Sequence, residues 1–372
     1  MRQIYLDHNA STPIAPEVAQ AMRKALDTAF GNPSSQHWAG APARQLLESA
    51  RRQVADLLGC AAQEVVFTSG GSEANNLAIK GAFFASNRTR RHFIATRIEH
   101  PAMVAPLHFL ESLGATVSWL AVGGNGHIDP DELRRAITPD TILISIMHAN
   151  NEVGAIQPIT DCAAIARQHG IAFHTDAAQS VGKIATRVDE LGVDLLSLAG
   201  HKFQAPKGVG ALYIRNGTML EPLIHGAGHE RGRRAGTESA LLAAALGAAS
   251  ELAADLAPMQ AVQHLRDRFW EQLRDAFGSA VRMNGEAGPR LPNTLSVSFV
   301  GRIGADILAA MPQVAASTGS ACHAGRVELS AVLQAMGVAP ETGMGAIRFS
   351  LGRTTTADEI DQVVTALRRA LA

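Results

Sequence analysis

Short apolar runs alternate with stretches of helical periodicity between residue 64 and residue 215. The apolar runs cover 64–69, 92–97, 116–122, 142–148, 171–177, 195–201 and 210–215, and helical patterns occupy 72–86, 101–112 and 160–169. Most of these runs are continuously apolar, as strands are when helices cover both faces of their sheet. The pattern therefore predicts an α/β fold with a mainly parallel central sheet.

The pattern changes toward the C-terminal third of the chain. An Ala/Leu-rich stretch from Thr237 to about Phe277 predicts one long helix. Residues 293–299 then alternate polar and apolar, which is typical of a half-exposed antiparallel strand. We expect a large domain over 16–255 and a smaller α+β domain built from 1–15 and 256–372.

Composition and charge narrow the classes of function. The chain has 372 residues, of which 47% are hydrophobic and 18% are charged, so folded domains rather than disorder are expected. A formal net charge of -1 provides no long-range field for nucleic acid or an anionic membrane. The sequence shows no apolar signal segment and no uncharged apolar stretch of about 18 residues. We expect a cytoplasmic protein that acts on a small substrate.

The cysteines are few and scattered. Cys60, Cys162 and Cys322 are widely spaced and form no CxxC pair. This pattern predicts neither a disulfide framework nor a zinc site, and no metal is expected. In a reducing compartment a free thiol stays available for chemistry.

Several predicted strands end in polar residues that suit a ligand better than a strand. These segments are 69–72, 99–100, 148–151, 174–179 and 200–202. The carboxyl ends of parallel strands share the edge of the sheet where ligands bind, so the segments are expected to converge there. One such segment alone is more often an ordinary turn or cap, and only the set favours a charged heterocycle.

The segment TSGGSEANN (68–76) lies between a predicted strand and a predicted helix. Its glycines would let backbone N–H groups approach a ligand, and Ser72 as N-cap would place the helix dipole against a phosphate. Taken alone, the segment is more often a plain glycine turn with a capping serine. The chain lacks GxxxxGK[ST] and a clean GxGxxG, so no nucleotide fingerprint supplies the phosphate interpretation.

Two ionisable residues complete a recognisable set. Asp176 ends the apolar run 171–177, where a carboxylate needs a cationic partner or good donors, and a pyridinium N–H is one such partner. Lys202 follows the run 195–201, and a partly desolvated lysine has a lowered pKa and reacts with aldehydes. Pyridoxal 5'-phosphate (PLP) requires this combination of lysine, acid and phosphate cup.

Spaced motifs along nearly the whole chain resemble one family, the NifS/IscS-type PLP-dependent cysteine desulfurases of fold-type I. The motifs are YLDHNASTP, GNPSSQH, FTSGGSEANN, EHPAM, HANNEVG, HTDAAQS, GHKFQAPKGVGALY, GHERGRRAGTES, STGSACHAG and IRFSLGR. The resemblance implies an enzyme that converts L-cysteine to L-alanine and passes the sulfur, through a persulfide, to an acceptor protein. Which acceptor receives the sulfur stays open.

The resemblance also implies a role for individual residues. Lys202 would bind PLP covalently and then move the substrate α-proton, with His100 stacked on the ring and assisting proton transfer. The other implied cofactor contacts are Asp176 at the pyridinium, Gln179 and Asn151 at the ring or substrate, Gly71, Ser72 and His201 at the phosphate, and Thr237 from the second subunit of a homodimer. Arg348 would bind the substrate carboxylate, for which a planar guanidinium is well suited, whereas Arg353 is assigned either a substrate role or a structural one.

Cys322 lies among small residues in Ser320-Ala321-Cys322-His323 and resembles the persulfide-forming cysteine of the family, carried on a long loop. His323 is a weaker candidate for holding its thiolate. Cys60 and Cys162 are interpreted as structural, because small buried cysteines are common.

Two features of the sequence depart from the family or leave an alternative open. Ala199 replaces the serine that the family commonly has two residues before the lysine-motif histidine, which predicts weaker cofactor retention. The histidine after Cys322 also resembles selenocysteine lyases, which would release selenide and alanine. A PLP aminotransferase or lyase of another kind, and a non-catalytic sulfur-trafficking scaffold, are further alternatives; the first would not need Cys322 and the second would not need Lys202, Asp176 and His100.

Overall fold

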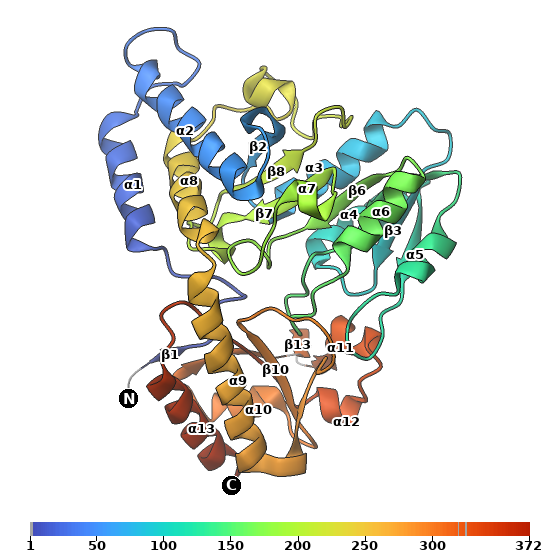
Figure 1. Cartoon of the computed structure of the whole chain (residues 1–372), viewed down its shortest axis with the longest axis vertical. Helices are drawn as coiled ribbons and strands as arrows, with labels where there is room; N and C mark the ends of the chain where they lie inside the picture. Colours follow the sequence, from blue (N-terminus) through green and yellow to red (C-terminus); the bar gives the residue numbers. More distant parts are fainter. Residues whose placement is uncertain (1–2, 319, 324–325) are drawn as a thin grey trace.

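The computed structural model describes residues 3–318, 320–323 and 326–372, and these form two parts, each built around its own sheet (Figure 1). The larger part, at the top of Figure 1, holds a seven-stranded sheet, and the smaller part below it holds a four-stranded sheet. The two chain ends both lie in the smaller part.

The seven-stranded sheet follows the predicted apolar runs. In spatial order its strands are β2 (Val65–Thr68), β8 (Gly210–Ile214), β7 (Leu195–Ala199), β6 (Ala172–Asp176), β5 (Thr141–Ser145), β3 (His92–Thr96) and β4 (Thr116–Leu120). Only β8 runs antiparallel to its neighbours. The predicted α/β fold with a mainly parallel sheet is confirmed.

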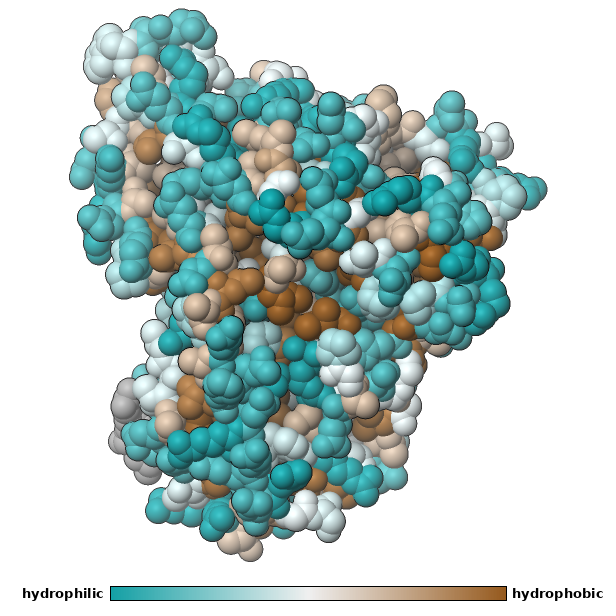
Figure 2. All heavy atoms as spheres, in the orientation of Figure 1, coloured by the Kyte–Doolittle hydropathy of each residue, from teal (hydrophilic) through white to brown (hydrophobic). Residues whose placement is uncertain are grey.

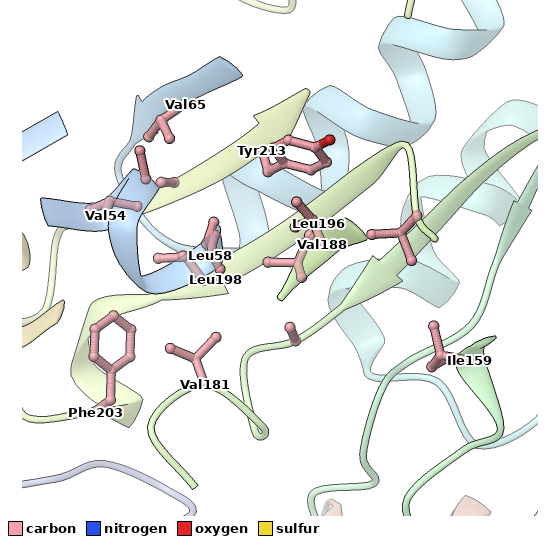
Figure 3. Close-up of a cluster of buried hydrophobic side chains, with 14 of the residues drawn as sticks. Val54, Leu58, Val65, Ile159, Val181, Val188, Leu196, Leu198, Phe203 and Tyr213 are labelled. Carbon is pink, nitrogen blue, oxygen red and sulfur yellow. The ribbon is translucent and has the colours of Figure 1, made fainter. Parts of the chain in front are cut away.

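Helices cover both faces of this sheet, which explains why its strands are continuously apolar. On one face the core includes Leu196, Leu198 and Tyr213, packed against Val54, Leu58 and neighbouring side chains from the covering helices (Figure 3). On the other face Leu195 and Leu212 belong to a separate cluster with side chains of the helices at 71–85 and 101–111. Successive residues of one strand therefore enter different cores, as the period of two requires.

The helices of the larger part are α1 (Pro16–Thr28), α2 (Gly40–Leu58), α3 (Gly71–Ala85), α4 (Pro101–Glu111), α5 (Pro130–Ala136), α6 (Ile159–Gln168), α7 (Val188–Leu191) and α8 (Ala240–Ala254), with short 3-10 helices η1 (Ala62–Glu64), η2 (Gly200–Lys202) and η3 (His229–Gly232). Helices α3 and α4 lie on one face of the sheet, and α2, α5, α6, α7 and α8 contribute to the core on the other.

The smaller part contains an antiparallel sheet in the order β12 (Ser317–Thr318), β15 (Ala346–Ser350), β10 (Thr294–Phe299) and β9 (Val281–Met283). Its helices are α9 (Ala257–Phe277), η4 (Gly278–Ala280), α10 (Gly304–Ala309), α11 (Ala331–Ala335), α12 (Pro340–Gly343) and α13 (Ala357–Leu371). The N-terminal strand β1 (Ile4–Tyr5) pairs in parallel with β11 (Val314–Ala315), and β13 (Ser320–His323) forms a hairpin with β14 (Arg326–Leu329).

The single long helix expected from Thr237 onward is wrong. The stretch forms two helices, α8 and α9, bent by 70° at the break between them. At the break Asp255 leaves the helical region, and its side chain accepts a hydrogen bond of 3.0 Å from the Ala257 N–H. Pro258 lies in the first turn of α9, where a missing N–H costs nothing, so proline marks the new helix start.

The half-exposed strand expected at 293–299 is also wrong in one respect. Strand β10 is antiparallel as predicted, but all of its residues are buried. Its polar residues find partners inside the protein: Asn284 donates to Ser296 Oγ at 3.1 Å and accepts from Ser298 Oγ at 3.0 Å. The alternation of polar and apolar residues in β10 therefore reflects one polar and one apolar face, both buried, and not one face exposed to solvent.

A small apolar cluster links the two parts. Ile98 and Met147 from the larger part pack with Val332, Leu333 and Met336 from the smaller part. In Figure 2, apolar side chains (brown) gather near the middle of the molecule, between its upper and lower parts. Within the described residues, no single helix is long and apolar enough to cross a membrane; only the bent pair α8 and α9, counted together, has that length and hydropathy.

Candidate active site

The polar strand ends of the larger sheet surround one cavity of about 380 Å³. Most predicted ligand residues line it: Gly71, Ser72, His100, Asn151, Asp176, Gln179, His201, Lys202 and Arg348, together with Asn9, Asn75 and Ala199. A larger cavity of about 450 Å³ lies where β5, β6 and β7 begin and contains none of these residues. The chemistry is therefore concentrated at the carboxyl ends of the strands, as expected for a parallel sheet.

Lys202 ends the short helix η2, directly after the buried strand β7. Its Nζ donates to the backbone carbonyls of Asn9 at 2.7 Å and Ala10 at 2.9 Å. Burial and the charge of Arg348 lower the pKa of Lys202 to about 8, although Asp176 and Asp7 oppose this. Near neutral pH a larger fraction of this amine than of an ordinary lysine is therefore unprotonated and able to act as a nucleophile.

Asp176 ends strand β6 and is 6% exposed. One carboxylate oxygen accepts from Asn75 Nδ2 at 2.7 Å, and the other accepts from the Ala178 N–H at 2.9 Å. Asn75 lies one turn into α3, so the helix that presents its N-terminus to the cavity also orients this carboxylate. These two donors satisfy the carboxylate at a buried strand end.

His100 is the N-cap residue of α4, where its Nδ1 accepts from the Ala102 N–H at 3.1 Å. That contact requires Nδ1 to be unprotonated and holds the ring at the cavity wall. Burial lowers the pKa of His100, the charge of Asp176 raises it, and the charge of Lys202 lowers it, with a net lowering. His100 is therefore a neutral imidazole near neutral pH.

Helix α3 begins at the cavity, but its start differs from the prediction. The N-cap is Gly70, with φ of 150°, and Ser72 is the second helical residue, so Ser72 does not act as the N-cap. Glycine is favoured at this position because side chains rarely adopt such a φ. The first backbone N–H groups of α3 still lack partners within the helix, because the first helical bond is donated by Ala74.

His201 lies beside Lys202, and its Nδ1 is 3.4 Å from Ser11 Oγ. Burial first, and then the charges of Lys202 and Lys207 and the proximity of His100, lower the pKa of His201 to about 4. The ring is therefore neutral, and it offers hydrogen bonds rather than a charge to the cavity.

Arg348 projects from β15 into the same cavity and is 8% exposed. Its two terminal nitrogens donate to the Asn151 carbonyl at 2.9 Å, Asp7 Oδ1 at 2.8 Å and Ser317 Oγ at 2.9 Å, whereas Nε is buried without a partner. The ion pair with Asp7 fixes the guanidinium, and the free Nε is a donor that an anionic ligand could use.

Thr237 is not brought into the Lys202 cavity within this chain. It is exposed and lines a separate cavity of about 230 Å³ with Arg234 and Glu230. Its loop is held by a buried pair in which both terminal nitrogens of Arg51 donate to the Glu230 carboxylate, at 2.7 and 2.8 Å. Arg353 does not line the cavity that holds Asp176 and Arg348, and it donates to the Asp255 carbonyl at 2.8 Å.

The backbone of Cys322 lies in β13, paired with Val327, but its side chain and that of His323 are outside the described part of the structure. The other two cysteines are poor sources of thiolate, because burial first, with nearby carboxylates, raises the pKa of Cys60 and of Cys162 to about 12. Among the described residues, no group of three or more His, Cys, Asp or Glu could hold a metal ion.

Four residues that the sequence analysis did not assign belong to this site. The Asn9 carbonyl accepts a hydrogen bond from the Lys202 amine, and Asn75 donates one to Asp176. Asp7 forms an ion pair with Arg348, and Lys183 donates a hydrogen bond to Gln179 Oε1 at 2.8 Å. Asn9 and Asp7 lie in the YLDHNASTP motif and Asn75 in TSGGSEANN, so the motifs marked the right segments. The contacts of Asn9, Asn75 and Asp7 join residues more than 100 positions apart, which no local pattern reveals.

Comparison with known proteins agrees with the geometry. The class-V aminotransferase family matches residues 4–363. The cysteine desulfurase IscS of Dictyoglomus turgidum (strain DSM 6724 / Z-1310) is 46% identical over 372 residues, which cover 99% of this chain and 94% of the relative. A solved NifS-like protein superposes with a TM-score of 0.93 at 35% identity, covering 99% of both chains.

A second solved structure, SspA in complex with cysteine, has a TM-score of 0.85 at 37% identity, covering 95% of this chain and all of that one. The names of these relatives support cysteine desulfurase over the selenocysteine lyase alternative. The chain belongs to the class-V aminotransferase family and, within it, to the cysteine desulfurases.

Proposed function

We propose that this cysteine desulfurase uses PLP bound to Lys202 to release the sulfur of L-cysteine, and that Cys322 receives it. The Cβ–S bond of the substrate breaks, the sulfur bonds to the sulfur of Cys322, and the carbon product takes up a proton to leave as L-alanine. The persulfide on Cys322 then supplies an acceptor protein. One cysteine and one thiol give one alanine and one persulfide, so no external oxidant is needed.

The residues of the cavity fit PLP. A Cβ on Gly71 would lie 3.1 Å from the Ala199 Cβ, so the glycine keeps the cradle at the start of α3 open, and nothing lies within 4 Å of a Cβ at Gly70. Unpaired N–H groups at that helix start suit a phosphate, while Asp176 suits a pyridinium N–H. When bound, PLP supplies an electron sink for the carbanion at the substrate α-carbon.

The protein side chains then have separate tasks. Lys202 would hold the cofactor covalently, and its free amine would remove the substrate α-proton. His100, neutral and fixed through Nδ1, covers the ring and takes part in proton transfer. Gln179 and Asn151 contact the ring oxygen or the substrate, and Arg348 binds the substrate carboxylate. Ser72 and His201 complete the phosphate site, which in this chain lacks a hydroxyl at Ala199.

Thr237 and the domain organisation extend the proposal beyond one site. Thr237 is exposed on a loop away from its own chain's cavity, which is consistent with a homodimer in which it completes the phosphate site of the partner. The two parts correspond to a large domain (16–255) and a smaller one (1–15 with 256–372). A cytoplasmic setting fits a persulfide, because the reducing environment keeps Cys322 a free thiol.

The observation that carries the proposal is that Lys202, Asp176 and Arg348 line one cavity, in which burial lowers the pKa of the Lys202 amine. The test is to load the purified protein with PLP and quantify alanine after adding cysteine and, separately, selenocysteine. Wild type should form alanine from cysteine, and Lys202→Ala should lose at least about a thousandfold of that rate, because the covalent attachment and the base both disappear.

A Lys24→Met variant on the exposed face of α1 is the matched control and should keep wild-type activity. Oxo-acid instead of alanine would point to an aminotransferase. Alanine from selenocysteine alone would revive the lyase, and unchanged activity in Lys202→Ala would refute the role of the lysine.

A further inference from the structure

Lys183 is a buried lysine to which the proposed function gives no task. It follows strand β6 by a few residues and is 7% exposed. Its Nζ donates to Gln179 Oε1 at 2.8 Å and to Asn9 Oδ1 at 3.1 Å. Burial and then the charges of Lys202 and Arg348 lower its pKa well below the ordinary value. Both the ammonium and the neutral amine have the two N–H groups that these contacts need.

These contacts determine which way the Gln179 amide faces. Lys183 donates in this pair, so Gln179 Oε1 turns toward it and Nε2 turns away. Nε2 then donates to the Asn9 carbonyl at 2.9 Å. Gln179 lines the active-site cavity, so the second N–H of Nε2 is left for a ligand there.

Asn9 connects Lys183 to the reactive amine of Lys202 through hydrogen bonds. Its Oδ1 accepts from Lys183 and from Asn293 Nδ2 at 2.9 Å, and its Nδ2 donates to Thr294 Oγ1 at 2.8 Å. The Asn9 carbonyl accepts a hydrogen bond of 2.7 Å from the Lys202 amine. A side chain that fixes Asn9 therefore also fixes the group that holds Lys202.

Lys183 contacts Gln179 and Asn9 but lies outside the active-site cavity that Gln179 and Asn9 line. It lines a second cavity of about 180 Å³, together with His8, Gly352 and Arg353, and Lys202 borders both cavities. Lys183 does not line the active-site cavity of about 380 Å³. Its hydrogen-bonded contacts toward the cofactor site therefore run through Gln179 and Asn9.

We propose that Lys183 is a positioning residue that holds the Gln179 amide and Asn9 from behind, so that Gln179 presents an N–H to the cofactor and Asn9 keeps Lys202 in place. This inference rests on the proposed function, because the cofactor that Gln179 would contact is PLP.

The test is a double-mutant cycle on the PLP-loaded enzyme with Lys183→Met, Gln179→Leu and the double variant. We expect Lys183→Met to weaken PLP binding about tenfold and to shift the visible absorption maximum of bound PLP. In the Gln179→Leu background the same substitution should change PLP affinity less than about twofold, because its target is gone. A purely structural lysine would lower stability without moving the band.

Lys183→Arg retains donors and should keep the wild-type band, and Lys24→Met on the exposed face of α1 should change neither readout. The proposal is overturned if Lys183→Met keeps the wild-type affinity and band, if Lys183→Arg shifts the band as Lys183→Met does, or if the effects of Lys183→Met and Gln179→Leu multiply.

The apoenzyme gives a readout that does not depend on PLP. The equilibrium constant for unfolding should show coupling of about fivefold between positions 183 and 179. If wild type binds no PLP but this coupling is present, the proposed function fails while the contact of Lys183 stands. Absence of the coupling overturns the positioning role even when wild type is fully active.

Discussion

At the residue scale, the reactivity of the site depends on the surroundings of Lys202. The amine lies in a buried setting among Arg348, Asp176 and Asp7, and the net effect lowers its pKa to about 8. Because Arg348 is the largest charged contributor, the residue that would bind the substrate carboxylate also helps to keep the amine unprotonated. Asp7 restrains that arginine through the 2.8 Å ion pair.

The first prediction concerns this dependence. In the apoenzyme, the rate at which Lys202 reacts with 1-fluoro-2,4-dinitrobenzene, a neutral reagent that does not titrate, should rise with pH and level off above a midpoint near 8, because only the neutral amine reacts. Arg348→Gln should move the midpoint upward, toward the ordinary lysine pKa. Mass spectrometry of the peptide that contains Lys202 measures the rate, with exposed Lys24 in the same digest as reference. A wild-type midpoint at the ordinary lysine value would contradict the account.

Sequence alone identified many residues of this site, but not the contacts that orient them. Lys202, Asp176, His100 and Arg348 stood out because charged or reactive side chains close buried strands or lie in family motifs. Asn75, Asn9 and Lys183 carry no such signal, because a polar side chain is informative only when its partner is known. The partner of Asp176 lies 101 positions away in the chain.

At the scale of elements, the periodicity predicted the central sheet because each of its strands is enclosed by helices on both faces. The periodicity gave wrong predictions where one pattern is compatible with two different structures. Alanine and leucine favour a helix on either side of the α8–α9 break, and only Asp255 and Pro258 mark the break itself. The alternation in β10 was assigned to solvent exposure, whereas its serines face Asn284 inside the protein.

The loop that carries Thr237 depends on one buried ion pair between elements. Arg51 of α2 and Glu230 of η3 are 2% and 4% exposed, and Glu230 also accepts from the Phe67 N–H of β2 at 2.9 Å. Glu230 and Arg231 have φ of 47° and 59°, a strained region for residues other than glycine. The ion pair therefore maintains a backbone shape that the loop would not adopt alone.

The second prediction follows from this pair. Arg51→Met should lower the free energy of unfolding by about 3–5 kcal/mol, because Glu230 would remain buried without its cation. Arg52→Met, the neighbouring substitution on the exposed face of α2, should change it by less than about 0.5 kcal/mol. Urea unfolding measures both. Similar small losses in the two variants would show that Glu230 does not depend on Arg51.

At the scale of the whole molecule, several buried histidines are held neutral by their surroundings. Burial lowers the pKa of His148 to about 4 and of His174 to about 3, and burial with the charge of Lys183 lowers that of His8 to about 4. Glu99 has the opposite shift, since burial raises its pKa to about 8. Stability in acid therefore reflects opposing contributions from these buried groups.

The third prediction isolates one of these groups. His148 is 4% exposed, and between about pH 6.5 and about pH 4 its unfolded form binds a proton that the folded form does not. Stability from this residue therefore rises with pH and is lost as the pH falls through that window. Relative to His148→Gln, wild type should lose about 1.4 kcal/mol of unfolding free energy per pH unit there. If the unfolding free energies of the two proteins changed equally with pH, His148 would not be neutral in the folded state.

The central claim is tested most directly by one turnover of the PLP-loaded enzyme with a stoichiometric amount of L-cysteine, followed by mass analysis of the peptide that contains Cys322. The account predicts one added sulfur atom on Cys322 for each alanine formed, the same result in Cys60→Ala, and no persulfide in Cys322→Ala. Alanine formed at the wild-type rate in Cys322→Ala, or sulfur recovered on Cys60 instead, would contradict it.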